Sequence, residues 1–256
     1  MRDGDAVRRA VREARPDVVL HLAAYTAVDR AEAEADLAMA VNRDGTANVC
    51  AACREAGARV VYVSTDYVFD GRASAPLAPA APRSPLGAYA RAKAAGEAVV
   101  ERSGAAWAIV RSAWAFGPGG PNFVDTVRRA AAERRPLRVV DDQVGTPTST
   151  RLLAEGLWAL VAIGAGGIWH LTAAGATSWH GVARAVYGAA GADPGLVAPC
   201  TTAESGRVAP RPAYSVLDCA ATERALGAPL PAWQPHVAAY AGGGRLPGLG
   251  ILEGES

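Results

Sequence analysis

Lys93 is the only lysine among the 26 basic residues of this 256-residue chain, and it follows Tyr89 by four positions. On a helix, residues four apart lie on one face, one turn from each other. The remaining basic residues are arginines, which carry a wide planar fork where lysine offers a compact point charge. An ammonium group lowers the pKa of a nearby phenol towards the working pH, so this pair predicts a proton donor. A solvated surface lysine beside an unrelated tyrosine is the alternative.

Short apolar runs alternate with longer helical patterns along the chain. Continuous apolar strands separated by helices are typical of a parallel sheet that is covered on both faces. The sequence therefore predicts a doubly wound, Rossmann-like α/β fold, whose ligands bind beyond the carboxyl ends of the strands. The strand-like runs cover residues 18–23, 60–63, 107–110, 137–140 and 168–171, and the helical patterns lie near residues 5–14, 34–56, 88–102, 122–134, 149–163 and 179–189.

Polar or aromatic segments follow the first three strand-like runs, over residues 23–29, 64–70 and 112–122. Because the carboxyl ends of parallel strands meet at one edge of a sheet, these segments are expected to form a cleft. The second segment includes Thr65 and precedes the Tyr89/Lys93 pair in the sequence.

The pattern loosens after about residue 140, where prolines and glycines punctuate short segments. We expect a partial dinucleotide-binding domain over residues 1–140 and a smaller lobe, mainly substrate-binding, over residues 141–241. The two are expected to interleave along the chain. The glycine-rich and acidic segment 242–256 predicts a disordered tail.

Composition argues against several classes of protein. Half of the residues are apolar and the net charge is +1, so neither nucleic acid nor an anionic membrane is expected as a partner. The apolar runs are shorter than the ~20 residues of a bilayer span, and no signal-like segment follows Met1. Cys50 and Cys53 lie in an alanine-rich helical pattern, and no cysteine or histidine set has zinc-ligand spacing. We therefore expect no metal and a cytoplasmic, reducing location.

A glycine-rich turn that would hold a pyrophosphate at a helix N-terminus is missing from the sequence. No G-x-x-G-x-x-G precedes the run at 18–23, and the glycines of segment 117–120 are followed by proline. We expect the chain to begin inside the domain, after a first βαβ unit of roughly 30–40 residues, with Met1 an internal residue or a misassigned start. The strand at 18–20 would then present an open, apolar edge.

The chain resembles the dTDP-4-dehydrorhamnose reductases, a branch of the extended short-chain dehydrogenases. The resemblance runs from about residue 3 to residue 240 and rests on eight segments in matching order. They are RPDVVLHLAAYTAVDRAE (15–32), STDYVFDG (64–71), YARAKAAGE (89–97), RSAWAFGPGGPNF (111–123), DDQVGTPT (141–148), WHLTAAGATSW (169–179), RPAYSVL (211–217) and LPAW (230–233).

This resemblance implies reduction of the C4 ketone of a dTDP-linked 4-keto-6-deoxyhexose by NADPH or NADH, with dTDP-4-dehydrorhamnose as the first candidate. It makes Tyr89 the proton donor to the C4 oxygen. Lys93 would lower the pKa of Tyr89 and hold the nicotinamide ribose, and Thr65 would bind the substrate oxygen. Charge developing on one oxygen, with a phenol, an ammonium and a hydroxyl aimed at it, is consistent with this assignment. The hydride chemistry would belong to the cofactor.

The resemblance also assigns further residues to the cofactor side or the substrate side of the site. The cofactor side would include Ala23, Ala24, Thr26 and Val63 together with Tyr89 and Lys93, and the substrate side would include Thr65, Asp66, Tyr67, Trp114, Asn122 and Arg211. Core packing is the alternative for Trp114, a structural salt bridge is the alternative for Arg211, and Asp29 is expected to cap a turn. The related sugar 4,6-dehydratases carry glutamate where Tyr67 stands, which favours simple reduction over loss of water.

Three departures from the family pattern bear on these expectations. The residue that selects NADPH or NADH is absent along with the glycine loop. Arg151 stands where some dimeric members carry a metal-binding glutamate, so we expect a monomer or a weak homodimer. His21 replaces a common asparagine.

Two other functions stay open. One is reduction of another deoxysugar, of a streptose-type or antibiotic pathway. The other is that of a non-catalytic nucleotide-binding or regulatory subunit.

Overall fold

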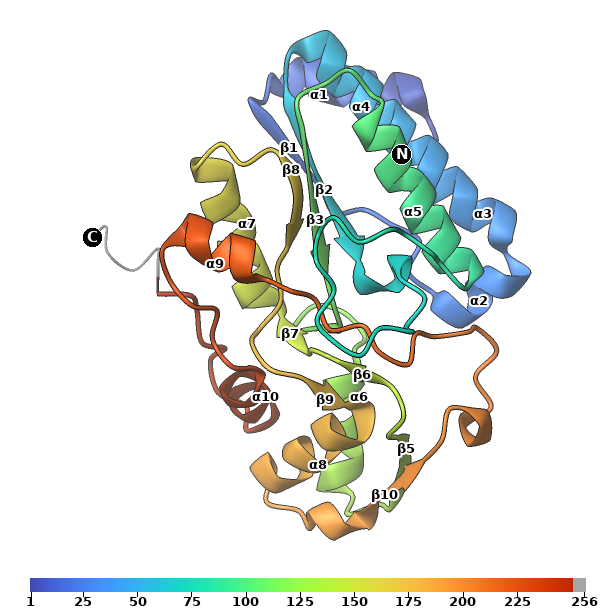
Figure 1. Cartoon of the computed structure of the whole chain (residues 1–256), viewed down its shortest axis with the longest axis vertical. Helices are drawn as coiled ribbons and strands as arrows, with labels where there is room; N and C mark the ends of the chain where they lie inside the picture. The colour runs from blue at the N-terminus through green and yellow to red at the C-terminus, as the bar shows by residue number, and fades with distance from the viewer. Residues whose placement is uncertain (251–256) are drawn as a thin grey trace.

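Four parallel strands form the central sheet of residues 1–250, the part of the chain that this computed structural model describes. The strands lie in the order β1-β2-β3-β8 (Figure 1). The parallel, helix-covered sheet predicted from the apolar runs is confirmed. The strands are β1 (Val18–His21), β2 (Arg59–Thr65), β3 (Trp107–Ser112) and β8 (Gly167–His170).

Helices cover both faces of this sheet, because successive strand residues point to opposite sides. Val60 and Tyr62 of β2 pack in a cluster with residues of one helical layer, and Val61 packs in a different cluster with Leu157 and Leu160. The first layer holds α1 (Gly4–Ala14), α4 (Gly45–Ala56) and α5 (Ala88–Glu101), and the second holds α7 (Thr150–Ala162) and α9 (Ala220–Leu226).

The helical pattern predicted over residues 34–56 is interrupted. It consists of α3 (Ala35–Met39), a π-helical turn over Ala40–Asp44, and α4, and it follows the short helix α2 (Val28–Ala33). Asn42 lies buried in the π turn, where its side chain accepts from the Tyr25 amide at 2.8 Å and donates to the Tyr25 carbonyl at 3.0 Å. The turn thereby fixes the segment that follows β1, next to the predicted cleft.

A smaller lobe lies below the sheet in Figure 1. Its core joins Val127, Val182, Val186, Tyr187 and Val237. The lobe contains the helices α6 (Phe123–Ala132), α8 (Trp179–Ala189) and α10 (Trp233–Ala241). It also contains three two-stranded pairs. In these, β5 (Leu137–Val140) pairs with β10 (Val197–Cys200), β6 (Val144–Gly145) with β9 (Thr177–Ser178), and β4 (Ala115–Phe116) with β7 (Thr148–Ser149).

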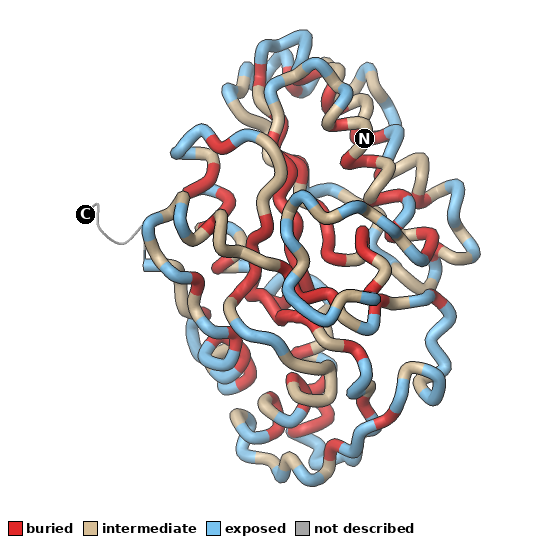
Figure 2. The backbone as a smooth tube through the Cα atoms, viewed as in Figure 1, coloured by how far each residue is buried: buried red, intermediate tan, exposed pale blue. Residues whose placement is uncertain are grey.

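The chain crosses between the two parts more than once. Helix α6 lies in the stretch predicted for the nucleotide-binding domain but packs in the core of the smaller lobe. Strand β8 and helix α7 come later in the sequence and return to the central sheet. Figure 2 shows the buried residues concentrated along the central strands and between the helices of the lower lobe.

Strand β1 lies at the edge of the central sheet and pairs only with β2 among the described residues. Next to it, Leu22 is 59% exposed, and Trp158 of α7 is 57% exposed. The open apolar edge expected from the sequence is therefore present in residues 1–250.

The predicted disordered tail begins at residue 242, but part of it is packed. Leu246 is buried, and its carbonyl accepts from Arg151 Nη1 at 3.0 Å. The amide of Leu249 donates to Glu155. Residues 251–256 of the predicted tail lie outside the described residues. Among residues 1–250, no helix combines the length and apolar character that crossing a bilayer requires.

Candidate active site

Thr65, Tyr89 and Lys93 line one cavity of about 520 Å³ at the carboxyl ends of the central strands. Thr65 is the last residue of β2, and Tyr89 lies in the first turn of α5 with Lys93 one turn further on. The strand end and the helix start thus bring the three predicted catalytic residues together, as the fold rule for α/β sheets predicts. The same cavity is lined by Ala24, Thr26, Val63, Trp114 and Ser112.

Lys93 is only 3% exposed. Its Nζ donates to the carbonyl of Val63 at 2.7 Å and lies 3.9 Å from the centroid of the Tyr62 ring. Burial lowers the pKa of Lys93 to about 7, against the opposing effect of the Glu97 charge. The sole lysine is therefore neither a solvated surface residue nor a permanent cation.

The expected lowering of the Tyr89 pKa is wrong. Burial raises the pKa of Tyr89 to about 12; a hydrogen bond with Thr65 opposes the rise, and the nearby Asp66 charge adds to it. The reason is that the Lys93 ammonium is directed at the Val63 carbonyl and the Tyr62 ring. Tyr89 is consequently a neutral phenol at neutral pH, which is the form that can donate a proton.

Asp66 is buried and bonded within the protein. It accepts from Thr65 Oγ1 at 3.0 Å and from Ser215 Oγ at 2.5 Å. Burial raises its pKa to about 6, although these hydrogen bonds lower it. Asp66 therefore orients the Thr65 hydroxyl and ties the end of β2 to a segment that lies 149 residues away in sequence.

A second cavity of about 490 Å³ is lined by Tyr67 and Arg211, both predicted on the substrate side. Arg211 donates from Nη2 to Asp29 at 2.9 Å, so the salt-bridge alternative for this arginine is also present. Asp29 additionally accepts from the Ala209 amide and from Arg207. The cap expected of Asp29 is not formed, since Ala27 is the N-cap of α2; Asp29 instead holds the loop that carries Arg211 against the first part of the chain.

Aromatic residues lie between the two cavities. Trp114, which lines the first cavity, stacks on Trp179, which lines the second, with ring centroids 3.7 Å apart and planes 9° apart. Phe123 meets Trp179 edge-on at 4.8 Å. Trp114 has φ of 46°, in the left-handed region that residues other than glycine seldom adopt. Strained backbone of this kind clusters at functional sites.

The cavities also meet at two tyrosines. The ring of Tyr67 contacts that of Tyr89 edge-on, with centroids 6.1 Å apart. Since Tyr67 lines the second cavity and Tyr89 the first, a ligand that fills both would pass these residues.

Three predicted residues, Ala23, Asn122 and the buried Asp66, do not line either cavity. Ala23 is exposed beside β1. Asn122 caps α6, where it accepts from the Asp125 amide at 2.9 Å and donates to the Gly117 carbonyl at 3.0 Å. Sequence reasoning missed Ser112, Phe123, Gln143, Trp179 and Arg207, all of which line a cavity. All of these except Arg207 lie within segments that carry the family resemblance, which is the signal that could have found them.

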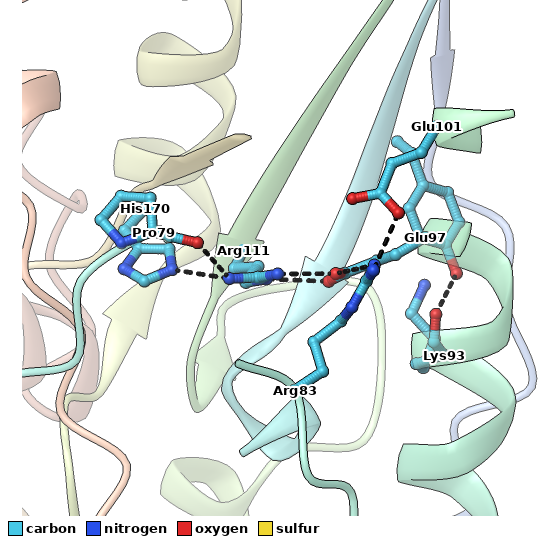
Figure 3. A network of polar contacts seen from close by, with 8 residues as sticks. Pro79, Arg83, Lys93, Glu97, Glu101, Arg111 and His170 are labelled. Carbon is cyan, nitrogen blue, oxygen red and sulfur yellow. Dashed lines mark hydrogen bonds and ion pairs between the residues drawn. The ribbon is translucent and has the colours of Figure 1, made fainter. Parts of the chain in front are cut away.

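A buried ion network anchors the helix that carries Tyr89 and Lys93 (Figure 3). Glu97, fully buried on α5, accepts from Arg111 Nε at 2.9 Å and Nη2 at 2.7 Å, and from Arg83 Nη1 at 3.1 Å. Arg111 lies on β3 and also donates to the Pro79 carbonyl and contacts His170 of β8. The network therefore fixes α5 against two neighbouring strands.

The first cavity offers groups suited to the nicotinamide half of a dinucleotide. It combines an apolar wall, which includes Leu20 and Leu153, with the phenol of Tyr89 and the amine of Lys93. Ser112 also lines this cavity, and its hydroxyl is buried with no hydrogen-bond partner among the described residues. Within residues 1–250, no group of three or more histidine, cysteine or acidic side chains could hold a metal ion.

Residues 1–243 match the family model described as RmlD substrate binding domain. A dTDP-4-dehydrorhamnose reductase of Streptomyces griseus is 45% identical over 238 residues, which cover 91% of this chain and 78% of that protein. A dTDP-4-keto-6-deoxy-D-glucose reductase of Streptomyces niveus is 41% identical, covering 89% and 80%. The structure of dTDP-4-dehydrorhamnose reductase from Bacillus anthracis in complex with NADP superposes with a TM-score of 0.87 at 36% identity, covering 91% of this chain and 83% of that one.

Proposed function

Because this chain belongs to the dTDP-4-dehydrorhamnose reductase family, we propose that it reduces the C4 ketone of a dTDP-linked 4-keto-6-deoxyhexose with NADPH or NADH. The observation that carries the proposal is the convergence of Thr65, Tyr89 and Lys93 on one cavity, directly beside a second cavity that holds Arg211. When bound, the reduced nicotinamide supplies a hydride to the C4 carbon.

Tyr89 donates the proton that the C4 oxygen needs as its charge develops. Its pKa of about 12 keeps the phenol protonated before the reaction. Lys93 lines the same cavity, where its positive charge would stabilise the phenolate once the proton has been transferred. The Thr65 hydroxyl donates its hydrogen to Asp66, so its oxygen is left as an acceptor next to the Tyr89 phenol. General acid catalysis of this type contributes roughly 10²–10⁴ to the rate.

The second cavity suits a nucleoside diphosphate. Arg211 and Arg207 lie at its wall and can pair with phosphate oxygens, for which the guanidinium fork is well shaped. Phe123 and Trp179 present aromatic rings of the kind on which a nucleobase stacks. The sugar would then extend past Tyr67 towards Tyr89.

The Arg211→Ala variant is expected to bind dTDP about 10–100-fold more weakly, because a charge-assisted hydrogen bond contributes about 1.5–3 kcal/mol. Isothermal titration with dTDP measures this effect. The matched control is Arg128→Ala, since Arg128 is exposed on α6, pairs with Asp125 and lines neither cavity. If the two variants bind dTDP with equal affinity, Arg211 does not contact the substrate, and its role is the salt bridge to Asp29.

Consumption of NADPH in the presence of a dTDP-4-keto-6-deoxyhexose tests the proposed function. Turnover with dTDP-4-dehydrorhamnose above that with other 4-keto sugars supports the rhamnose assignment. The reverse order supports the second candidate, reduction of another deoxysugar, which is favoured by the similarity to the Streptomyces niveus protein. Binding of dTDP without turnover of any sugar supports the non-catalytic alternative.

A further inference from the structure

The ammonium group of Lys93 rests on the face of an aromatic ring. Its Nζ lies 3.9 Å from the centroid of Tyr62, a residue of β2 that is 1% exposed. A cation within about 6 Å of a ring centroid is attracted by the negative face of the ring, and the attraction grows when both groups are removed from water. Neither the family pattern nor the Tyr89/Lys93 spacing points to Tyr62, because it lies three residues before the strand end.

Tyr62 is held in this position from several sides. Its hydroxyl reaches the Lys93 carbonyl at 3.5 Å, so one side chain contacts both ends of the same lysine. The helix approaches Tyr62 closely at Gly96, where an added Cβ would collide with the Tyr62 hydroxyl and with the Asn42 carbonyl. A glycine in the middle of α5 costs helix stability, and this close approach explains its presence.

The charged and titratable groups around Lys93 come from four elements. From β1, His21 is kept neutral, because burial and the Lys93 charge lower its pKa to about 4. On α5 itself, Glu97 favours the charged lysine, and Tyr89 is a neutral phenol. From β3, Arg111 is bound to Glu97. From α4, Cys50 of the Tyr62 cluster has its pKa raised to about 11 by burial and is neutral.

Among residues 1–250, the buried ammonium makes two direct contacts, with the Val63 carbonyl and with the Tyr62 ring. The Val63 carbonyl accepts a hydrogen bond from the Lys93 amine on one side, and the face of the Tyr62 ring contacts the amine on another side. His21 Nε2 cannot accept from Lys93, because the Thr46 hydroxyl donates to the Asn42 carbonyl at 2.7 Å and therefore receives the Nε2 hydrogen. Among residues 1–250, no hydrogen bond joins the other ring nitrogen of His21 to Lys93. The ring face is therefore the contact that substitutes for water on that side of the lysine.

We propose that Tyr62 is a positioning residue for the active site, whose ring face holds the Lys93 amine in the cavity and favours its protonated form. The inference rests on the proposed function, in which the ammonium stabilises the Tyr89 phenolate. Without the ring, Lys93 would lose its proton at lower pH and would be free to leave the Val63 carbonyl.

The single lysine makes this inference directly measurable. Lysine labelled with ¹³C at Cε gives one side-chain resonance in this chain, and its titration reports the pKa of Lys93, which burial lowers to about 7. Replacing Tyr62 with phenylalanine keeps the ring face and is expected to leave this pKa nearly unchanged. Replacing it with 3,4,5-trifluorophenylalanine keeps the shape but removes the negative face, and is expected to lower the pKa by about 0.5–1.5 pH units.

The pH profile of kcat/KM provides the second readout. The loss of activity on the alkaline side is expected to move to lower pH by the same amount in the trifluoro variant, and to stay in place in Tyr62→Phe. An unchanged Lys93 titration in the trifluoro variant would overturn the inference, as would an equal shift in Tyr62→Phe. If the titration shifts but turnover survives in Tyr89→Phe, the positioning of Lys93 by Tyr62 stands and the catalytic assignment of the proposed function fails.

Discussion

The Tyr89→Phe variant is expected to lose about 10²–10⁴-fold in kcat while its affinity for dTDP stays nearly unchanged. The phenol is the one neutral acid that lines the first cavity beside Lys93 and Thr65 among the described residues. Removing its hydroxyl removes the proton but leaves the ring that packs against Tyr67. Steady-state kinetics with a dTDP-4-keto sugar and titration with dTDP measure the two quantities separately.

Tyr187→Phe is the matched control. This tyrosine is buried in the core of the smaller lobe and donates to the Arg135 carbonyl, away from both cavities. Loss of the Tyr187 hydroxyl is expected to lower the free energy of unfolding and to leave kcat within about twofold of the wild-type value. The reason is that a change outside the active site acts on folding. Turnover of Tyr89→Phe at the rate of Tyr187→Phe would contradict the assignment of Tyr89 as the acid.

The Glu97→Gln variant is expected to lose about 3–5 kcal/mol of the free energy of unfolding, because it leaves Arg111 buried without a counter-charge. Arg111 is 1% exposed and gives two of its hydrogen bonds to Glu97. Urea unfolding measures the change. The control is Glu101→Gln, one turn further along α5, where the carboxylate is partly exposed and pairs only with Arg83. An exposed pair of this kind contributes about 0–1 kcal/mol.

The effect of Glu97→Gln on the free energy of unfolding is also expected to depend on pH. Burial tends to raise the pKa of Glu97, but Arg111 outweighs this and holds the pKa below its ordinary value of 4.5. A carboxyl whose pKa is depressed by folding stabilises the protein above the pKa of the unfolded state and loses that contribution as the pH falls through the folded value. The difference between wild type and Glu97→Gln is therefore expected to be full at neutral pH and to narrow below about pH 4.5. A constant difference from neutral to strongly acidic pH would contradict a charged Glu97.

The sequence predicted the central sheet well, because its strands are continuous apolar runs and their helices have clear boundaries. The elements that it did not predict include α9, β10 and α10. Strand β10 contains Pro199, and proline usually argues against a strand because it cannot donate to a ladder. Helix α10 carries Pro235 in its first turn, a position where proline is tolerated although it usually indicates a break. Local patterns of this kind carry little information about pairing with a distant strand.

The residues of the active site also differ in how far local sequence patterns could predict them. Thr65, Tyr89 and Lys93 could be predicted because a strand end and one helical turn place them. The contacts of Asp66 with Ser215 and of Asp29 with Arg211 join segments 149 and 182 residues apart, and no local spacing indicates them. The pKa of Tyr89 was predicted in the wrong direction, because the partners of the Lys93 amine depend on how α5 packs on β2.

Transfer of deuterium from NADPH that is deuterated at C4 of the nicotinamide tests the central claim most directly. The protein is incubated with this NADPH and a dTDP-4-keto-6-deoxyhexose, and the product is examined by NMR. The account predicts one deuterium at C4 of the sugar and a new hydroxyl there, with the transfer lost in Tyr89→Phe. Recovery of the unreacted 4-keto sugar with NADPH unconsumed, or deuterium at another carbon, would contradict it.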